Sequence, residues 1–545
     1  MAAGGRSVAR ALACALAAAS AAAAAGPSFT ADYSQTATPL NMPLLDCVGS
    51  GHGSLALRAD YREHLARVQR DIGFKHVRGH GLLHDDMSAL LGGRASLANL
   101  FSVVDFYLSV GLRPFFEVSY MPQALAADPD ALIMHYRACV SAFAADKAQA
   151  WAAFVAEVFA GLEARYGADE VRTWSIECWN EPAGSGFKPR PNTTRQAAYF
   201  ELYEVTARAV ASVDPLLRVG GPATQSLLWI PDLLNFTDAG RRVPQSFVST
   251  HYYPTEMGAA EITRTSWEDN ITAAADVAEA AGLPLVVTEF SAGLANGAYD
   301  APFAAAFVVH AAAAFLGARN VPTLSWWTFS DVFEETGFMS QTWVNTYGLQ
   351  TKYGVPKPAY RAFEMLAALP ATGVFVDADA GGAPRRPGSG PAARCTATVG
   401  TVDVVTAVDS SLGTTVVLHA LVTNFNANVE NATDPTTGLP IATASGVTIT
   451  FSGLPARAVL PTAASLSLID STHAWARPAF VANSSPMYPT PAQIAAEQEA
   501  SLVVPVPIPL VDRGGGQVSF TLPDLEPYAV ARVLVSIAVP PPHPL

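Results

Sequence analysis

Positive charge is scarce in this chain of 545 residues, which has 33 Lys and Arg against 47 Asp and Glu and a formal net charge of −14. Proteins that bind nucleic acids use clustered Lys and Arg to contact phosphates, and the sequence contains no such cluster. We therefore expect no nucleic-acid partner. Charged residues make up 15% and apolar residues 50% of the chain, a balance that predicts a globular protein with a large core.

Cysteine is also rare, with five residues in the chain, one of which lies in the apolar N-terminal segment. The other four, Cys47, Cys139, Cys178 and Cys395, lack the spacing of metal ligands and are too sparse for a disulfide framework. We expect these four to be buried free thiols, with at most one bridge among them.

Long apolar runs are confined to the N-terminus, so no other segment is predicted to span a membrane. Residues 1–25 combine two arginines with a run of Ala and Leu that ends in small residues, the pattern of a cleaved signal peptide. An uncleaved anchor is the alternative. Five Asn-X-Ser/Thr sequons also fit a secretory route, at Asn192, Asn235, Asn270, Asn431 and Asn483. We expect a secreted protein, or one held in a vacuole or lysosome-like compartment.

Eight short apolar runs alternate with longer patterns of helical spacing between residues 42 and 368. The runs are Pro43–Val48, Lys75–His80, Arg113–Ser119, Arg172–Trp179, Arg218–Gly221, Phe247–Tyr253, Leu283–Phe290 and Leu324–Phe329. The helical patterns include Tyr61 to Ile72, Ala148–Leu162, Ala197–Val213, Ile271–Ala281 and Pro302–Leu316. Eight repeats of strand then helix predict an α/β fold of the (β/α)8 barrel type.

A different pattern begins at residue 369 and continues to residue 545. Alternating stretches rich in β-branched residues predict an all-β sandwich domain. The extended segment 26–41 contains Ser28–Asn41, which is a candidate extra strand of that domain. Residues 377–393 are rich in Gly, Pro and Ala and predict a flexible loop, and the Pro-rich tail 539–545 is expected to be loose.

Two glutamates each end a strand-like run, Glu181 after the fourth run and Glu289 in the seventh. Active sites of such barrels lie at the C-terminal ends of the strands, so we expect both carboxylates at one mouth. Glycosidic bond cleavage needs a pair of carboxyl groups, one protonated at the leaving oxygen and one ionised near the anomeric carbon. The pair therefore predicts a glycosidase.

Polar and aromatic residues near the ends of other runs are candidates for binding a sugar. Asn180 can hydrogen-bond a hydroxyl beside the reacting carbon, and Trp326 and Trp327 can offer a flat apolar platform. The other candidates are His52, His80, His251, Tyr253, Glu334 and Glu335. The alternatives are that the rings belong to the packed core and that the Glu334–Glu335 pair is a solvated charge pair.

These motifs resemble glycoside hydrolase family 39, the β-xylosidase and α-L-iduronidase family, and are most similar to its β-xylosidase branch. The segments that carry the resemblance include Cys47–Gly53, Phe74–Leu83, Arg113–Glu117, Trp179–Pro182, Val219–Pro222, Thr288–Phe290, Trp327–Glu335, Pro356–Phe363, Leu468–His473 and Met487–Thr490. Coverage extends over most of the chain beyond residue 25, including the predicted β domain.

The resemblance implies a retaining double displacement, with Glu181 as the acid/base, Glu289 as the nucleophile and Asn180 as the contact to the 2-hydroxyl. It implies an oligosaccharide or glycoside as the substrate and no metal or organic cofactor. It also implies that a sugar subsite is lined by His80, His251, Tyr253, Glu334 and Glu335.

One departure within the family bears on the sugar. In the iduronidase branch, basic residues follow the histidine that ends the sixth strand, whereas Tyr252 and Tyr253 follow His251 here. We therefore expect a neutral pentose and an exo-acting, β-xylosidase-like enzyme. The alternatives are an iduronidase-like or other clan A glycosidase, or a non-catalytic carbohydrate-binding protein. The natural sugar, the aglycone and the oligomeric state are not determined by the sequence.

Overall fold

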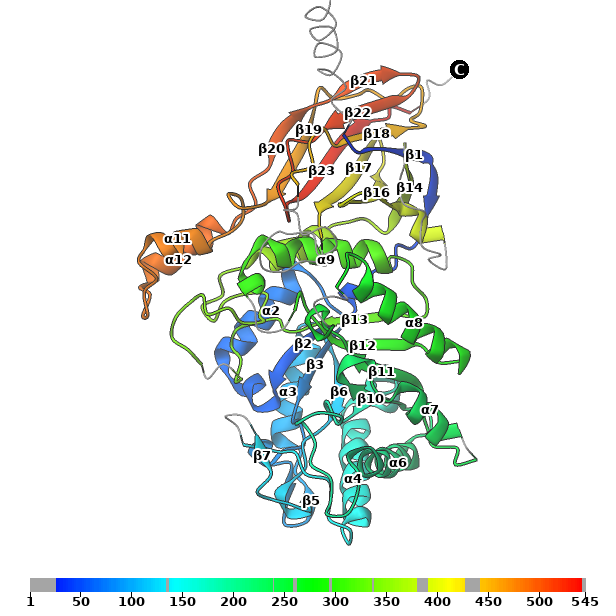
Figure 1. The fold of residues 1–545 in the computed structure, drawn as a ribbon, viewed down its shortest axis with the longest axis vertical. Coiled ribbons are helices and arrows are strands. Elements are labelled where there is room, and N and C mark those ends of the chain that lie inside the picture. Colours follow the sequence, from blue (N-terminus) through cyan, green and yellow to red (C-terminus); the bar gives the residue numbers. More distant parts are fainter. Residues whose placement is uncertain are drawn as a thin grey trace, which may run out of the picture.

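The computed structural model describes residues 26–133, 137–238, 240–257, 262–293, 297–335, 338–379, 391–426 and 442–541. Four predictions lie wholly or mostly outside these residues: the signal segment 1–25, the sequon at Asn431, most of the loop 377–393 and the end of the tail. Figure 1 shows a barrel surrounded by helices, with a β domain stacked on one side of it.

Eight parallel strands close into a barrel in the spatial order β10-β11-β12-β13-β2-β3-β6-β9, so each strand pairs with its successor in the barrel and the last pairs with the first. They are β2 (Cys47–His52), β3 (His76–His80), β6 (Arg113–Val118), β9 (Ser175–Cys178), β10 (Arg218–Thr224), β11 (Phe247–His251), β12 (Leu285–Phe290) and β13 (Thr323–Trp326). Each contains one of the predicted runs in whole or in part. The predicted (β/α)8 barrel is therefore confirmed.

Helices cover the outside of the barrel (Figure 1). They are α2 (Ala59–Asp71), α3 (Ala98–Ser109), α4 (Ala148–Tyr166), α5 (Ala168–Val171), α6 (Arg195–Val213), α7 (Ile230–Asp238), α8 (Ser266–Ala280), α9 (Pro302–Phe315) and α10 (Pro358–Ala367). The five predicted helical patterns correspond to α2, α4, α6, α8 and α9. Within the described residues, no helix combines the length and apolarity needed to cross a membrane.

The β domain is one sheet of eleven strands. They are β1 (Ser28–Ala37), β14 (Thr372–Ala378), β15 (Thr396–Val399), β16 (Val402–Leu412), β17 (Thr415–Asn424), β18 (Thr448–Ser452), β19 (Ala463–Ile469), β20 (Val506–Pro509), β21 (Val511–Gly514), β22 (Gln517–Thr521) and β23 (Val530–Ala538). As expected, the N-terminal segment adds a strand, β1, between β14 and β18. Strands from both ends of the order share one apolar core, so the sheet curls into a sandwich.

An arm of the β domain, residues 470–503, leaves the sheet after β19 and returns at β20. It carries α11 (Arg477–Ala482) and α12 (Pro491–Ala500), which extend beside the barrel (Figure 1). The indole of Trp475 donates to the backbone oxygen of Asp300 at 2.6 Å, and the indole of Trp343 donates to Glu497 at 2.8 Å. The arm therefore holds loops that follow barrel strands.

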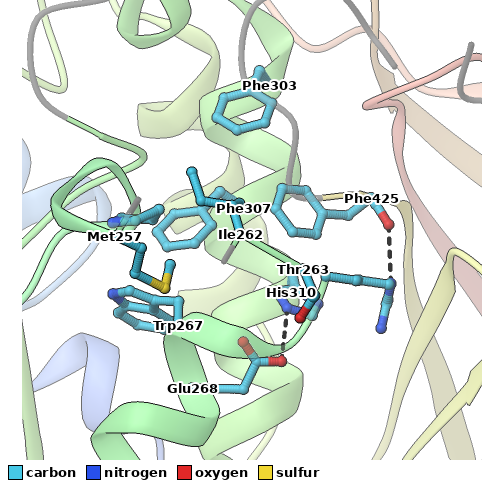
Figure 2. Close-up of a pocket in the computed structure, with 11 residues that line it drawn as sticks. Met257, Ile262, Thr263, Trp267, Glu268, Phe303, Phe307, His310 and Phe425 are labelled. Atoms are coloured by element: carbon cyan, nitrogen blue, oxygen red, sulfur yellow. Dashed lines mark hydrogen bonds and ion pairs between the residues drawn. The ribbon is translucent and has the colours of Figure 1, made fainter. Parts of the chain in front are cut away.

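A second contact between the two parts centres on His310 of α9 (Figure 2). Its ring stacks on Phe425 at 4.5 Å between centroids, and its two nitrogens lie 2.8 Å from Asp403 and 3.1 Å from Glu268. Burial alone would lower the pKa of His310, but the charges of Glu268 and Asp403 outweigh it and raise the pKa. Arg264 also pairs with Asp403, at 2.5 Å. Ion pairs and apolar packing together fix the barrel to the β domain.

Cys47, Cys139 and Cys178 are buried free thiols, as the sequence predicted, and Cys395 is also buried.

Candidate active site

Glu181 projects from a sharp turn directly after β9. Trp179 and Glu181 both have left-handed backbone angles, with φ of 72° and 45°. Such angles are costly for residues other than glycine and persist where neighbouring contacts hold them. Here the N–H of Glu181 donates to the backbone oxygen of Ala223 at 2.9 Å, and the indole of Trp179 donates to that of Gly186 at 2.9 Å. These contacts aim the Glu181 side chain from the end of its strand.

Glu289 lies at the end of β12, a strand that is buried throughout. One of its carboxylate oxygens accepts a hydrogen bond from Arg78 at 2.7 Å, and the other accepts one from the hydroxyl of Tyr253 at 2.9 Å. His80 and His251 approach the same carboxylate at 3.6 Å and 3.4 Å. Donors therefore surround Glu289 and stabilise its negative charge.

Arg78 is the centre of the charged cluster beneath the mouth and is fully buried. Its guanidinium lies 2.7 Å from Glu117, 2.6 Å from Glu177 and 2.7 Å from Glu289. It also donates to the amide oxygen of Asn180 at 2.9 Å. One planar cation thus fixes Asn180 and Glu289 relative to each other.

His80 carries a second positive charge beside Glu289. Its Nδ1 lies 2.8 Å from Glu117. Burial alone would lower the pKa of His80, but the charge of Glu117 outweighs it and raises the pKa to about 9. Burial alone would likewise raise the pKa of Glu117, but the charges of His80 and Arg78 lower it to about 2. The two groups are therefore an imidazolium and a carboxylate at neutral pH.

His251 connects the two candidate carboxylates and is neutral. Its Nε2 lies 3.3 Å from Arg78, and because a guanidinium can only donate, this nitrogen is the acceptor. The proton is then on Nδ1, which donates to Glu181 at 3.0 Å. Burial lowers the pKa of His251 to about 4, which agrees with the neutral ring.

The two candidate carboxylates lie close together across the mouth. One oxygen of Glu181, one oxygen of Glu289 and one nitrogen of His251 all lie within 4.8 Å of one another. Burial raises the pKa of Glu181, although the charges of His80 and Arg78 oppose this effect. A close pair in which donors surround one carboxylate and burial raises the pKa of the other is suited to nucleophile and acid roles.

Trp326 and Trp327, the two residues of the predicted sugar platform, point in different directions. Trp327 lies at the mouth, where its ring is 4.7 Å from that of His80 and it packs with Tyr253 and Phe333. Trp326 points to the opposite side of the strand and packs against Phe290 and, at 5.6 Å, Phe363 of α10. Successive residues of a strand face opposite sides, so Trp326, which was also predicted to bind the sugar, does not share the mouth with Trp327.

Glu334 and Glu335 follow β13 at the same mouth. Glu334 is buried and accepts a hydrogen bond from the backbone N–H of His52 at 2.9 Å. Glu335 is exposed to solvent. Partial desolvation of its carboxyl group, together with the charge of Glu334, nevertheless raises the pKa of Glu335. The charges of Glu181 and Glu289 also act on Glu335, which places it within electrostatic range of both.

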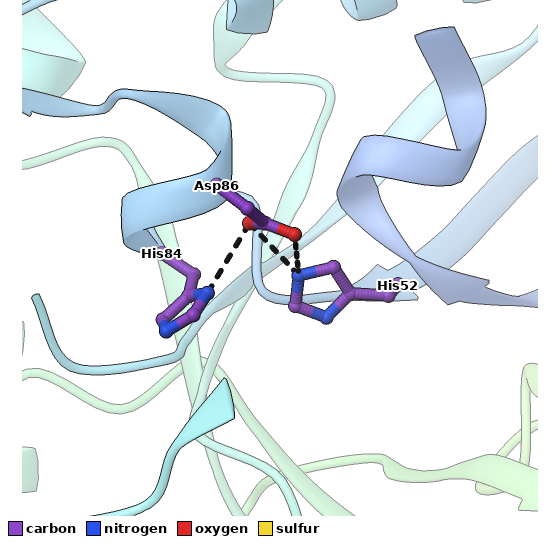
Figure 3. A group of neighbouring side chains, drawn as sticks. All are labelled: His52, His84 and Asp86. Carbon is purple, nitrogen blue, oxygen red and sulfur yellow. Dashed lines mark hydrogen bonds and ion pairs between the residues drawn. The ribbon is translucent and has the colours of Figure 1, made fainter. Parts of the chain in front are cut away.

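The side chain of His52 belongs to a small cluster with His84 and Asp86 (Figure 3). Its Nε2 lies 2.8 Å from Asp86, and His84 Nδ1 lies 3.2 Å from the same carboxylate. The N–H of Cys139 donates to His84 Nε2 at 3.2 Å, which leaves the His84 proton on Nδ1, facing Asp86. The Asp86 carboxylate therefore links the two imidazole rings. His52 meets Glu334 through its backbone, and its ring is directed at Asp86 rather than at the two candidate carboxylates.

Comparison with known proteins agrees with this geometry. Residues 30–514 match the sequence profile of glycosyl hydrolases family 39. The chain belongs to this family. It is 35% identical to a β-xylosidase of Caldicellulosiruptor saccharolyticus over 359 residues, which cover 62% of this chain and 71% of the relative. It is 37% identical to a β-xylosidase of Geobacillus stearothermophilus over 349 residues, covering 59% and 68%.

Among solved structures, the fold is similar to that of a family 39 β-xylosidase from Caulobacter crescentus. The TM-score is 0.72 over 93% of this chain and 99% of that chain, at 24% identity. This likeness supports the barrel and the β-sandwich domain, and family membership makes the protein a glycoside hydrolase.

Three charged residues of the candidate site were not singled out from the sequence: Arg78, Glu117 and Glu177. A signal was present, because Arg78 is two residues before His80 in one strand and so shares its face. Glu117 and Glu177 are charges at buried positions of β6 and β9, and buried charges require partners. A search for such isolated charges would have found the cluster.

Proposed function

We propose that this protein is a retaining, exo-acting β-xylosidase-like glycosidase in which Glu181 is the acid/base and Glu289 the nucleophile. The observation that carries the proposal is the approach of the two carboxylates, with oxygens within 4.8 Å of each other. Retaining glycosidases hold their carboxyl groups roughly 5–5.5 Å apart, whereas inverting enzymes leave a wider gap for water.

In the first step, Glu289 attacks the anomeric carbon while Glu181 transfers its proton to the departing glycosidic oxygen. The bond from the sugar to the leaving group breaks and a glycosyl ester of Glu289 forms. In the second step, Glu181 takes a proton from water, the water oxygen bonds to the anomeric carbon and Glu289 leaves as a carboxylate. Arg78 and Tyr253 hold Glu289 in place for both steps.

A neutral pentose fits the charge around the site. Arg78 is already shared among three carboxylates, and His80 pairs with Glu117. Tyr253, after His251, directs its hydroxyl to Glu289. A uronate would bring a further negative charge to positive groups that are already paired. The names of the two curated relatives, both β-xylosidases, support the same choice.

Hydrolysis of matched 4-nitrophenyl glycosides tests the proposal. We expect β-xyloside to be the best substrate in a panel with β-glucoside and α-L-iduronide, and NMR to show β-xylose as the first product. First release of α-xylose, or a higher kcat/KM on the iduronide, would contradict it. Glu289→Ala purified in parallel controls for contaminating glycosidases.

We also infer that the protein enters the secretory route. The described sequon asparagines, Asn192, Asn235, Asn270 and Asn483, are all exposed, as glycan attachment requires. Expression in a eukaryotic host should yield a product that begins near Gly26 and loses mass on treatment with peptide N-glycosidase. An intact N-terminus with no change in mass would contradict the inference.

A further inference from the structure

A buried lysine lies behind the loop that carries Glu334 and Glu335. Lys357 precedes α10 and is fully buried. Its ammonium lies 2.8 Å from Asp300, 2.8 Å from Asp331 and 2.8 Å from the backbone oxygen of Thr346. An ammonium has three protons, so three acceptors match its donor capacity.

The partners of Lys357 come from separate segments. Asp300 lies between β12 and α9 and also accepts the N–H of Asn345 at 2.8 Å. Asp331 lies after β13 and accepts the N–H of Gly348 at 2.8 Å. The loop between β13 and α10 is thus held at its start by Asp331 and on its return by residues 345–348. The site loop and the β12–α9 loop are joined through one cation.

Contacts continue from this cluster to the sugar site. Tyr347 lies between two of the held positions, and its backbone oxygen accepts the N–H of Thr328 at 3.1 Å. Its ring packs on Phe333 at 5.7 Å, and Phe333 packs on Trp327 at 5.7 Å. Burial, with the charges of Glu335 and other nearby carboxylates, raises the pKa of Tyr347 to about 12. Movement of the loop would therefore change the walls of the sugar site.

A buried cluster of charges is not needed for the stability of the fold alone. Buried ion pairs can often be replaced by apolar residues without loss of stability, whereas removing one partner is strongly destabilising. Burial alone would lower the pKa of Lys357, but the charges of Asp300 and Asp331 outweigh it and raise the pKa. A charged lysine with three directed contacts fixes orientation in a way that an apolar contact does not.

We propose that Lys357 is a positioning residue for the sugar subsite, which with Asp300 and Asp331 holds the β13–α10 loop so that Glu334 and Glu335 meet the non-reacting hydroxyls. The proposal rests on the proposed function of this site. Lys357 acts through the loop, and chemistry at the anomeric carbon stays with Glu181 and Glu289. The arm contributes to the same hold, because Trp475 donates to the backbone oxygen of Asp300.

The test compares Lys357→Met with a triple variant, Lys357→Met/Asp300→Asn/Asp331→Asn, which leaves no unpaired buried charge at the cluster. Folding is checked by circular dichroism, and the triple variant is used if the single variant does not fold. On 4-nitrophenyl β-xyloside we expect kcat/KM to fall about 10- to 100-fold, mainly through KM, since small misplacements at a site have effects of this size. Lys75→Met removes an exposed lysine as the matched control and should leave both constants unchanged.

A double-mutant cycle with Glu335→Gln separates positioning from general destabilisation. If Lys357 acts through the loop, adding its replacement to Glu335→Gln should cost less than about 3-fold more, because coupled residues are not additive. The 3-deoxy and 4-deoxy xylosides should likewise be less sensitive to the change than the xyloside. Fully multiplicative losses, or an equal fall in kcat for every substrate, would overturn the proposal. Failure of the wild type to hydrolyse any xyloside would instead overturn the proposed function.

Discussion

The two candidate catalytic glutamates lie within 4.8 Å of one another, yet their surroundings differ. Glu289 is nearly buried and accepts hydrogen bonds from Arg78 and Tyr253, with two histidines close by. Glu181 has one-third of its side chain exposed, and His251 donates to one of its oxygens. The difference shows how one mouth can surround one carboxylate with donors while burial raises the pKa of its neighbour, Glu181.

The asymmetry begins in the backbone. Glu289 lies within β12, near its end, and its carboxylate pairs with Arg78 of β3. Glu181 follows a turn with left-handed residues, which takes its side chain beyond the charged cluster. We infer that the strand β12 supplies the carboxylate surrounded by donors, and that the turn after β9 supplies the carboxyl group whose pKa is raised.

Glu289→Ala should have the largest effect, because it removes the carboxylate proposed to form the glycosyl ester. Turnover of 4-nitrophenyl β-xyloside should fall by at least about 10⁴-fold, the scale seen when an enzyme loses its nucleophile. Azide should restore part of the activity and give the α-glycosyl azide. Activity near that of the wild type would show that Glu289 does not have this role.

Glu181→Gln should be the next largest, since general acid–base catalysis contributes about 10²- to 10⁴-fold. The loss should be greater for an alkyl xyloside than for an aryl xyloside with a good leaving group, which needs little protonation. Burial raises the pKa of Glu181, so wild-type kcat/KM should fall as pH rises through that pKa and the acid loses its proton. An unchanged alkaline limb in the variant would assign the limb to another group.

Tyr253→Phe should have an intermediate effect, because it removes one donor from Glu289 and leaves Arg78 in place. Hydrogen bonds to charged groups contribute about 1.5–3 kcal/mol, so kcat/KM should fall about 10- to 100-fold. Full activity would mean that Arg78 alone suffices.

Glu117→Gln should have the smallest effect on the rate of hydrolysis. Its effect should be clearest in the pH dependence of thermal stability. His80 has its pKa raised from 6.5 to about 9 by Glu117, so the stability it adds is present below pH 6.5 and is lost as pH rises through 9. The wild type should therefore lose thermal stability between these pH values, and the variant should show a flatter profile. Parallel melting curves at both pH values provide the measurement, and identical slopes would contradict the pairing.

Much of the barrel is predictable from the sequence, because parallel strands that are buried on both sides form short apolar runs, and turn-forming residues mark the ends of these runs. The same reasoning missed the helices α3, α5, α7 and α10 around the barrel, and it missed β14 and β19 to β21. Strands β20 and β21 are exposed and only four residues each, so they carry little pattern. Their identity as strands depends on partners that are distant in sequence.

The sequence predicted where the site residues lie in the fold, but it did not predict which way their side chains point. Trp326 and Trp327 are adjacent in sequence, and only the twist and end of β13 decide which one reaches the mouth. His52 lies beside the mouth as expected, but its ring is directed at Asp86. Lys357 is 68 residues from Glu289 in the chain, and its relation to the site becomes visible through Asp300 and Asp331 alone.

The most direct test of the central asymmetry is trapping with 2,4-dinitrophenyl 2-deoxy-2-fluoro-β-xyloside, followed by peptide mass spectrometry. The fluorine slows both steps, and the good leaving group lets the first step proceed without protonation, so the glycosyl ester accumulates. We predict time-dependent inactivation and a single label on the peptide that contains Glu289, retained in Glu181→Gln and absent in Glu289→Ala. A label on Glu181, or on a peptide without Glu289, would contradict the account.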